Sequence, residues 1–350
     1  MNKPAAKRRM MQKRQMIQKR RMIQKGNTME GSSKKIVTYF SALTPGHKEK
    51  ISSAAEKNGF SVVFCGSKEE AAAEITDAEI YLGMDSDLIS KGSALKWVCS
   101  PSAGVGHLMG VLKGRDIMLT NSSGAYGVTI AEHIIMVTLE LMRRRMEYIE
   151  LIRNRTWENG LAIHSIQGAR ITMLGTGDIG YETAVRLKAF GPKSLIGVNR
   201  RGNNPNDMYD SICPISKLDS ILPQTDLLIC SLPSTDETRD LLTAARLSLL
   251  PTDAYIVNVG RGDVLDQKAL ENMLREGKLG GAALDVFREE PIPADDSLWD
   301  CPGLVITMHS AGTWTLPYTV GRIVDMFLTD LDLYCAGRKP ERFVDLSVGY

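Results

Sequence analysis

Three short motifs each carry one side chain that could take part in acid–base or carbonyl chemistry. Arg261 lies in NVGRG, Glu290 in DVFREEP and His309 in TMHSA, and each motif adjoins an apolar run typical of a strand. An arginine can bind a carboxylate or polarise an oxygen, and a histidine beside a carboxylate can act as a general acid or base. Any one of them alone would more often be structural. Three at successive strand ends indicate a shared cleft, because the carboxyl ends of parallel strands meet at one sheet edge.

A glycine-rich motif, GTGDIG, stands upstream of these segments. It comprises Gly175, Thr176, Gly177, Asp178, Ile179 and Gly180. It follows a predicted strand over 169–174 and opens a helix predicted to begin around Tyr181, which is the context of a dinucleotide-binding turn. Gly175 would make the tight turn, Gly177 would let the backbone approach a pyrophosphate, and Gly180 would let helix and strand pack closely. A plain turn between strand and helix is the alternative.

The end of the next predicted strand, 195–198, bears on the choice of dinucleotide. An NAD site usually places Asp or Glu near this point, where it binds the ribose hydroxyls. Asn199, Arg200 and Arg201 stand here instead. Guanidinium groups suit a 2′-phosphate, so the sequence favours NADP(H) over NAD(H). The alternative is a pair of solvated arginines, with Asn199 bonding a ribose hydroxyl.

Taken together, the motifs resemble those of the D-isomer-specific 2-hydroxyacid dehydrogenase family from about residue 36 to the end of the chain. The matching stretches are GTGDIG, NVGRGDVLD (258–266), DVFREEP (285–291), MHSAG (308–312) and, more softly, SAGVG (102–106) and IAEH (130–133). The resemblance implies an enzyme that transfers a hydride between NAD(P)H and a small 2-oxo acid or D-2-hydroxy acid. Glyoxylate and hydroxypyruvate are the expected substrates, by family analogy alone.

The resemblance also implies roles for individual residues. His309 resembles the acid/base that protonates the substrate oxygen, Glu290 its carboxylate partner, and Arg261 the group that binds the substrate carboxylate and polarises the carbonyl. Asp285 resembles the residue that holds the nicotinamide carboxamide. The backbone of Ala103, Gly104 and Val105 would form a second carboxylate anchor, although Gly106 stands where the family often has Asp. Further cofactor contacts are expected from Leu232, Pro233, Val259, Gly260, Arg261 and His309.

Strand and helix patterns alternate along the chain and predict an α/β protein. Its 350 residues suit two doubly wound, Rossmann-like or flavodoxin-like domains with a cleft between them. The resemblance implies a split substrate domain, 35–121 plus 309–350, around an NAD(P)-binding domain, 122–308. One long helix is predicted over 128–152. By the resemblance, the arm 130–157 would form a twofold contact in a homodimer, with Trp157 at the interface, whereas His133 would be structural.

Composition argues against several other classes of protein. No stretch approaches the roughly 18 apolar residues of a membrane helix. Six cysteines are scattered singly, which predicts free thiols in a reducing cytoplasm rather than disulfides or a metal site. The net charge of +2 depends on ten Lys or Arg in residues 1–29, and without them 33 basic residues face 41 acidic ones. An acidic body does not indicate nucleic-acid binding, so we expect a cytoplasmic enzyme.

The basic leader, residues 1–34, repeats about every six residues as KRRMMQ, KRQMIQ and KRRMIQ. A six-residue period cannot keep the apolar pairs on one helical face. We expect the leader to be disordered and dispensable, with Met29 as a candidate start. A nucleic-acid or membrane role for it is the alternative.

Two other functions remain open at this point. One is a non-catalytic, NAD(H)-sensing protein like the corepressors of the same family. The other is a phosphoglycerate dehydrogenase-like enzyme, although the short stretch after His309 leaves no room for the regulatory domain that such enzymes often carry.

Overall fold

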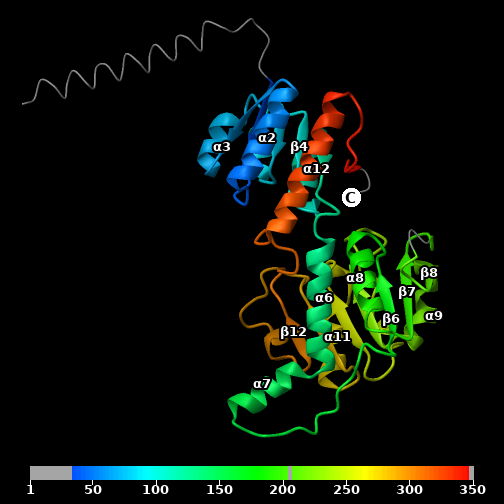
Figure 1. Cartoon of the computed structure of the whole chain (residues 1–350). Helices are drawn as coiled ribbons and strands as arrows, with labels where there is room; N and C mark the ends of the chain where they lie inside the picture. The colour runs from blue at the N-terminus through cyan, green and yellow to red at the C-terminus, as the bar shows by residue number, and fades with distance from the viewer. Residues whose placement is uncertain (1–33, 204–206, 347–350) are drawn as a thin grey trace, which may run out of the picture.

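The chain folds into two lobes, each built around a parallel sheet (Figure 1). The computed structural model describes residues 34–203 and 207–346. The predicted disorder of the leader therefore concerns residues outside the described part, apart from Lys34. Both doubly wound α/β units predicted from the sequence are confirmed. None of the helices in the described ranges is long and apolar enough to cross a membrane.

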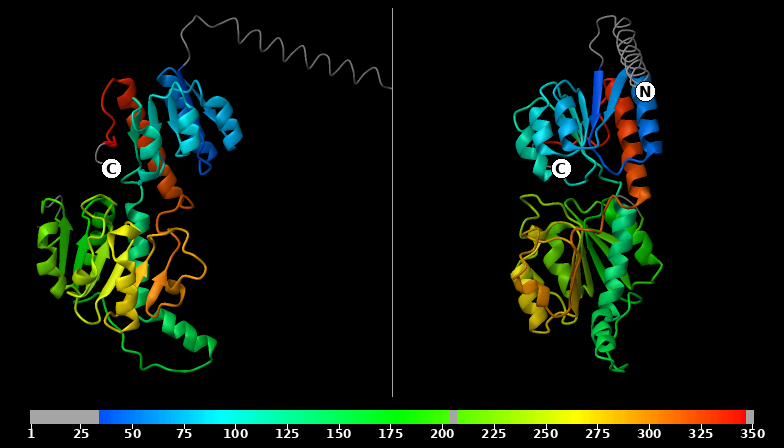
Figure 2. Two further views of the ribbon diagram at one scale, coloured as in Figure 1. Left: turned by 180° about the vertical axis from the view of Figure 1, so that it is seen from behind. Right: turned by 90° about the vertical axis from the view of Figure 1, so that its left-hand side faces the viewer.

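The first sheet has the strand order β2-β1-β3-β4-β5, the order of flavodoxin-like folds. Its strands are β1 (Lys34–Thr38), β2 (Phe60–Phe64), β3 (Ile80–Leu82), β4 (Trp97–Cys99) and β5 (Met118–Thr120). Its helices are α2 (Pro45–Lys57), α3 (Lys68–Glu74), α4 (Ser86–Lys91), α5 (Gly106–Leu112) and, from the far end of the chain, α12 (Pro317–Cys335). The apolar face of α12 packs on this sheet, where Phe327 stacks on Trp97 at 5.6 Å, and α12 runs beside α2 (Figure 2).

The second sheet has the order β12-β11-β10-β9-β6-β7-β8, and all of its pairings are parallel. Its strands are β6 (Arg170–Leu174), β7 (Ser194–Asn199), β8 (Ser211–Pro214), β9 (Leu227–Cys230), β10 (Tyr255–Asn258), β11 (Gly281–Leu284) and β12 (Leu304–Ile306). Its longer helices are α6 (Gly127–Met142), α8 (Asp178–Lys188) and α11 (Gln267–Arg275), with the single-turn α9 (Leu218–Ile221) and α10 (Ala244–Leu247). The direction of winding reverses between β6 and β9, and ligands of such sheets bind outside this switch point.

The chain crosses between the lobes twice. At the first crossing, Ala125 and Tyr126 still belong to the core of the first sheet, and α6 then packs against the second. At the return, Ala311 still belongs to the core of the second sheet. The domain boundaries at 121/122 and 308/309 stay a prediction, and these core contacts lie a few residues beyond both.

The prediction of one long helix over 128–152 is wrong. Two helices stand there, α6 and α7 (Arg145–Arg153), separated at Arg144, whose φ of 53° is left-handed. The buried face of α6 ends at Leu141 and Met142, whereas α7 buries no residue, so no core packing holds the two helices in one line.

Other element bounds also differ from the predictions. The helix after the glycine motif begins at Asp178, not around Tyr181, because Gly177 is already its N-cap. Trp157, expected on the helical arm, lies beyond the end of α7. The short elements α4, α5 and β8 were not predicted, because a segment of four to seven residues is too short to show a recognisable hydrophobic period.

Candidate active site

Glu290 and His309 meet at the carboxyl edge of the second sheet. They follow β11 and β12, and His309 Nδ1 lies 2.7 Å from Glu290 Oε2. The other carboxylate oxygen, Oε1, accepts the Phe287 N–H at 2.9 Å, which fixes the carboxylate. With Nδ1 taken by Glu290, Nε2 is the ring nitrogen left for a substrate.

Asp285, 3% exposed, organises the segment that carries His309. Its carboxylate accepts hydrogen bonds from Thr307 Oγ1 at 2.6 Å, Ser310 N at 2.8 Å and Ala311 N at 3.1 Å. Its carbonyl oxygen accepts the His309 N–H at 2.8 Å. This buried carboxylate therefore holds the backbone on both sides of His309, a residue whose own φ is 50°.

His133, expected to be structural, braces this network from α6. Its Nε2 lies 3.3 Å from Thr307 Oγ1. Burial lowers the pKa of His133, although the negative charges of Asp285 and Glu140 act in the opposite direction and raise it. Because Thr307 gives its one hydroxyl proton to Asp285, a neutral His133 would donate from Nε2. Its place in the IAEH motif was the only signal in the sequence for this contact.

Arg261 is held in a loop that the fully buried Asn258 shapes. Asn258 Nδ2 donates to the Arg261 carbonyl at 3.0 Å, and its Oδ1 accepts the Gly260 N–H at 3.0 Å. Gly262 lies so close to the backbone of Phe287 that a Cβ would overlap it, so the loops that carry Arg261 and Glu290 are pressed together. The sequence motif contains Asn258, but no role was predicted for it.

The first lobe brings its own loop to Arg261. The guanidinium lies against Gly104, where a Cβ would overlap Nη2, and Nη1 donates to the Gly260 carbonyl at 2.6 Å. Within the described part of the chain, the N–H groups of Ala103, Gly104 and Val105 have no hydrogen-bond acceptor. A guanidinium beside three free amides can bind an anion such as a carboxylate.

The glycine motif forms a tight turn at the switch point. Gly175 has a φ of 98°, and a Cβ there would come within 2.8 Å of Ser231 Oγ, on the loop after β9. A Cβ on Gly180 would overlap the Gly175 carbonyl, whereas one on Gly177 would meet nothing within 4 Å. Gly177 caps the eleven-residue helix α8, so the turn leaves an open helix N-terminus that fits a pyrophosphate.

The other residues of this turn point their side chains elsewhere. The Asp178 carboxylate lies against Gly127 at the start of α6. Thr176 is buried and Ile179 packs on the core. Leu232 and Val259, expected to contact a cofactor, also bury their side chains in the cores, which leaves their backbone for such contacts. Pro233 is exposed, and its carbonyl accepts Thr238 Oγ1 at 2.6 Å.

The end of β7 carries the two arginines. Asn199 Nδ2 donates to Thr176 Oγ1 at 2.9 Å, and Asn199 Oδ1 accepts the N–H groups of Arg201 and Gly202 at 3.1 and 2.7 Å. The Asn199 amide is therefore engaged in shaping this turn. Arg200 Nε lies 2.8 Å from Glu237 Oε2, and Arg201 is exposed.

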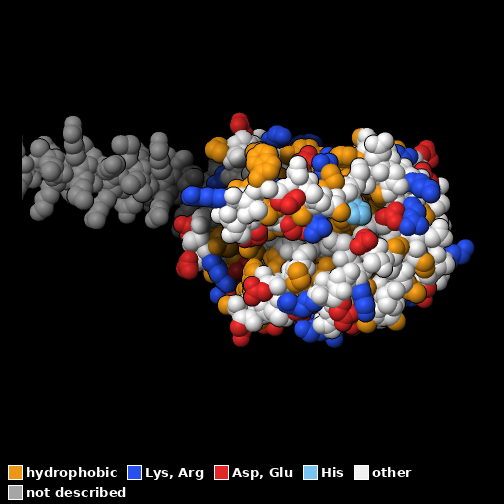
Figure 3. All heavy atoms as spheres, turned by 90° about the horizontal axis from the view of Figure 1, so that it is seen from below, with side chains coloured by type: hydrophobic (Ala, Val, Ile, Leu, Met, Phe, Trp, Pro, Cys, Tyr) orange, Lys and Arg blue, Asp and Glu red, His pale blue; other side chains and the backbone are white. Residues whose placement is uncertain are grey.

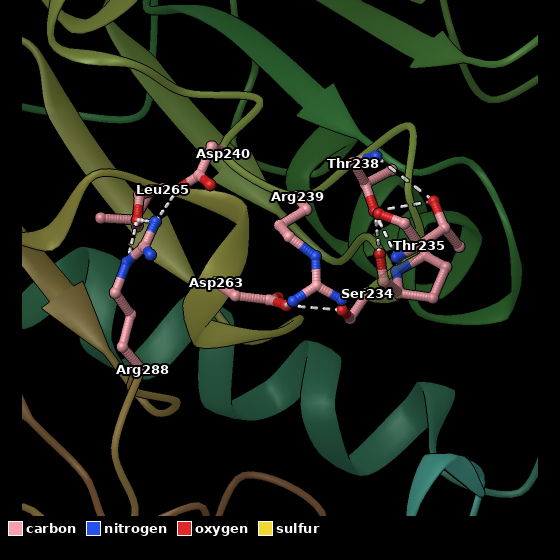
Figure 4. A network of polar contacts seen from close by, with 9 residues as sticks. Ser234, Thr235, Thr238, Arg239, Asp240, Asp263, Leu265 and Arg288 are labelled. Carbon is pink, nitrogen blue, oxygen red and sulfur yellow. Dashed lines mark hydrogen bonds and ion pairs between the residues drawn. The ribbon is translucent and has the colours of Figure 1, made fainter. Parts of the chain in front are cut away.

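A polar network joins the loop after β9 to the loops of Arg261 and Glu290 (Figure 4). Asp263 Oδ2 accepts Ser234 Oγ at 2.6 Å and lies 3.6 Å from Arg239 Nη1. Arg288 reaches the Leu265 carbonyl at 3.1 Å and pairs with Asp240. Asp263 lies two residues after Arg261, and Arg288 lies two residues before Glu290. This network therefore supports both loops from outside the site.

Comparison with known proteins gives a consistent result. The family profile described as "D-isomer specific 2-hydroxyacid dehydrogenase, NAD binding domain" matches residues 135–311. A glyoxylate reductase of Thermofilum pendens is 30% identical over 260 residues, which are 70% of this chain and 75% of that protein.

Two solved structures show the same architecture over most of the chain. A D-isomer specific 2-hydroxyacid dehydrogenase family protein of Aeromonas salmonicida is 30% identical with a TM-score of 0.80, covering 90% of this chain and 100% of its own. A D-isomer specific 2-hydroxyacid dehydrogenase of Xanthobacter autotrophicus, in complex with NADPH and MES, is 25% identical with a TM-score of 0.76, covering 91% of this chain and 100% of its own.

Proposed function

The chain belongs to the D-isomer-specific 2-hydroxyacid dehydrogenase family, and from that premise we propose that Arg261, Glu290 and His309 interconvert a small 2-oxo acid and its D-2-hydroxy acid. The contact of 2.7 Å between His309 Nδ1 and Glu290 Oε2, at the edge where Arg261 meets Gly104, carries this proposal. The two domains would be residues 35–121 with 309–350, and residues 122–308.

The residues of the chain would divide the chemistry as follows. A bound nicotinamide cofactor supplies or accepts the hydride at the substrate carbon. Arg261 and the amides of residues 103–105 bind the substrate carboxylate, and the guanidinium stabilises negative charge on the carbonyl oxygen. His309 Nε2 gives that oxygen a proton in reduction and takes it back in oxidation, while Glu290 holds the ring in place. Closure of the two lobes would exclude water.

A kinetic panel tests the reaction class. Glyoxylate, hydroxypyruvate and pyruvate would each be assayed for oxidation of NADPH and of NADH, with 3-phosphoglycerate assayed in the opposite direction. Glyoxylate and hydroxypyruvate are the proposed substrates, a choice supported by the glyoxylate reductase relative. Cofactor binding without turnover of any acid would favour the NAD(H)-sensing alternative, and preference for 3-phosphoglycerate would favour the phosphoglycerate one.

We expect NADPH to be preferred over NADH. The last residue of β7 is Asn199, where an NAD site usually has an acidic residue. The guanidinium groups of Arg200 and Arg201, which follow it, suit a 2′-phosphate. Replacing both arginines by Ala should raise the KM for NADPH about tenfold or more and change that for NADH little, because each charge-assisted hydrogen bond contributes about 1.5–3 kcal/mol. Arg338→Ala, at an exposed position after α12, is the control. An enzyme equally efficient with NADH would contradict the proposal.

We expect Glu290→Gln to lower kcat about tenfold in both reaction directions. Glutamine keeps the length of the side chain but replaces the charge-assisted hydrogen bond to His309 Nδ1, at 2.7 Å, by a weaker neutral one that holds the ring less firmly. Steady-state kcat, measured in reduction and in oxidation, checks this. Glu289→Gln is the matched control, and an unchanged kcat would remove Glu290 from this role.

We also propose that the protein forms a homodimer through the arm that includes α7. In this arm the exposed fractions of Met146, Ile152 and Trp157 are 46%, 66% and 95%, and α7 buries no residue within its own chain. The face seen from below carries hydrophobic side chains among charged ones (Figure 3). Sedimentation of Trp157→Ser beside the wild type would show whether this arm mediates association.

A further inference from the structure

Four successive backbone carbonyls, those of residues 100–103, accept hydrogen bonds from the first crossing between the lobes. The donors are Ser122 Oγ to Ser100 O (2.9 Å), Tyr126 OH to Pro101 O (2.5 Å), Ser122 N to Ser102 O (3.1 Å) and Asn121 Nδ2 to Ala103 O (2.9 Å). The loop ahead of α5 is thus tied to residues 121–126 through every carbonyl in this run. No side chain of the loop itself supplies these ties.

The amides that follow these carbonyls are left free. Buried backbone polar groups are nearly always paired, and Val105 is buried while Ala103 and Gly104 are half-buried, so these three unpaired N–H groups beside Arg261 are available to an anion. The direction of each amide depends on the peptide planes before it. The carbonyls of residues 102 and 103 share rigid peptide planes with the N–H groups of residues 103 and 104, so fixing the carbonyls of residues 100–103 orients these two donors and positions the chain that leads to the third.

Tyr126 connects this loop to the second crossing. Trp314 Nε1 lies 2.6 Å from the Tyr126 hydroxyl. An indole N–H can only donate, so the Tyr126 oxygen accepts it and must give its own single proton to Pro101 O. Burial raises the pKa of Tyr126 to about 12, so the hydroxyl stays a donor throughout the pH range of an assay.

The rings at this junction are also packed. Tyr126 is 6% exposed, and a Cβ on Gly312 would lie 3.0 Å from its ring. Trp314 contacts Phe40 edge-on, with ring centroids 5.2 Å apart. Since Trp314 lies five residues after His309, the segment of the acid/base and the loop of the carboxylate anchor converge on one hydroxyl group.

We infer that Tyr126 is a positioning residue for substrate binding: its hydroxyl, oriented by Trp314, holds the Pro101 carbonyl and so sets the amides of residues 103–105 for the substrate carboxylate. This inference rests on the proposed function of the site. Neither residue is proposed to touch the substrate. Trp314 acts through Tyr126, and Tyr126 through the loop.

Tyr126→Phe tests the inference, because it removes the hydroxyl and keeps the ring. We expect the KM for glyoxylate to rise about five- to tenfold, the fold-change that corresponds to one lost hydrogen bond, with the Kd for NADPH unchanged. Trp314→Phe should change the KM in the same direction by a smaller factor. In hydrogen-exchange measurements without substrate, the Ser122 amide, which donates to Ser102 O, should lose protection in Tyr126→Phe.

Tyr334→Phe is the matched control. It deletes a tyrosine hydroxyl bonded at 2.8 Å to Glu79 in the same lobe, next to Trp97 and far in the sequence from the anchor loop. It should leave both the KM for glyoxylate and the Ser122 protection unchanged, even where it lowers the melting temperature as much as Tyr126→Phe does.

The possible outcomes separate the inference from the proposed function. An active wild type with an unchanged KM in Tyr126→Phe would overturn the inference and leave the function standing. Unchanged exchange at Ser122 would overturn it whatever the activity. Faster exchange in an enzyme that reduces no 2-oxo acid would support the role of Tyr126 in the loop and instead contradict the proposed function.

Discussion

His309→Gln is expected to lower kcat by about 10²–10⁴-fold, the usual contribution of general acid–base catalysis. A glutamine amide can occupy the place of the ring but cannot give up a proton at neutral pH. Glu290, 2.7 Å from His309 Nδ1, would then have no acid to hold. The Kd for NADPH should stay nearly the same, because the glycine turn that would hold its pyrophosphate lies on the loop after β6, at the switch point, and not in the segment that carries His309.

The measurement is steady-state turnover with glyoxylate, together with a separate titration of NADPH by fluorescence. His164→Gln is the control, since its ring packs on Tyr255, at the start of β10, whereas the site lies beyond the ends of the strands. A His309→Gln enzyme with near wild-type turnover would overturn the mechanism. Loss of NADPH binding together with turnover would indicate a structural defect instead.

Arg261→Lys should lower kcat/KM on the order of 10²-fold, with both a higher KM for substrate and a lower kcat. Lysine keeps the charge but loses the planar fork that binds a carboxylate through two parallel hydrogen bonds. The guanidinium also rests against Gly104, a contact that a lysine ammonium cannot reproduce in shape. The backbone of the loop should persist, since Asn258 binds the carbonyl of residue 261 and not its side chain.

Arg246→Lys provides the same chemical change elsewhere. Arg246 on α10 pairs with Asp219 on α9 at 2.6 Å, and such surface pairs contribute about 0–1 kcal/mol. Its kinetics should match the wild type. Equal kcat/KM values for Arg261→Lys and the wild type would rule out the proposed double role of Arg261.

Much of the fold could be predicted because it depends on local patterns. The apolar runs that became β6, β9 and β10 are buried along their whole length or nearly so, and a parallel strand with both faces covered reads as a continuous apolar stretch. The glycine turn could also be recognised, because positive φ at Gly175 and close packing at Gly180 each require the absence of a Cβ. The helix break at Arg144 could not be predicted, because the hydrophobic pattern continues past it. The break depends on where the buried core ends, at the last residues of α6.

The sequence by itself determined the family, the two α/β units and the identity of Arg261, Glu290 and His309 as candidates, since each motif is a property of a few adjacent residues. Only the tertiary structure decided which distant groups touch. The Trp314–Tyr126 hydrogen bond joins residues 188 apart, and the contact of Gly104 with Arg261 joins two lobes. Such contacts depend on how the sheets pack and where the chain crosses between them. Hydrogen bonds need partners within about 3.2 Å, and local sequence patterns do not specify distances of that kind between segments far apart in the chain.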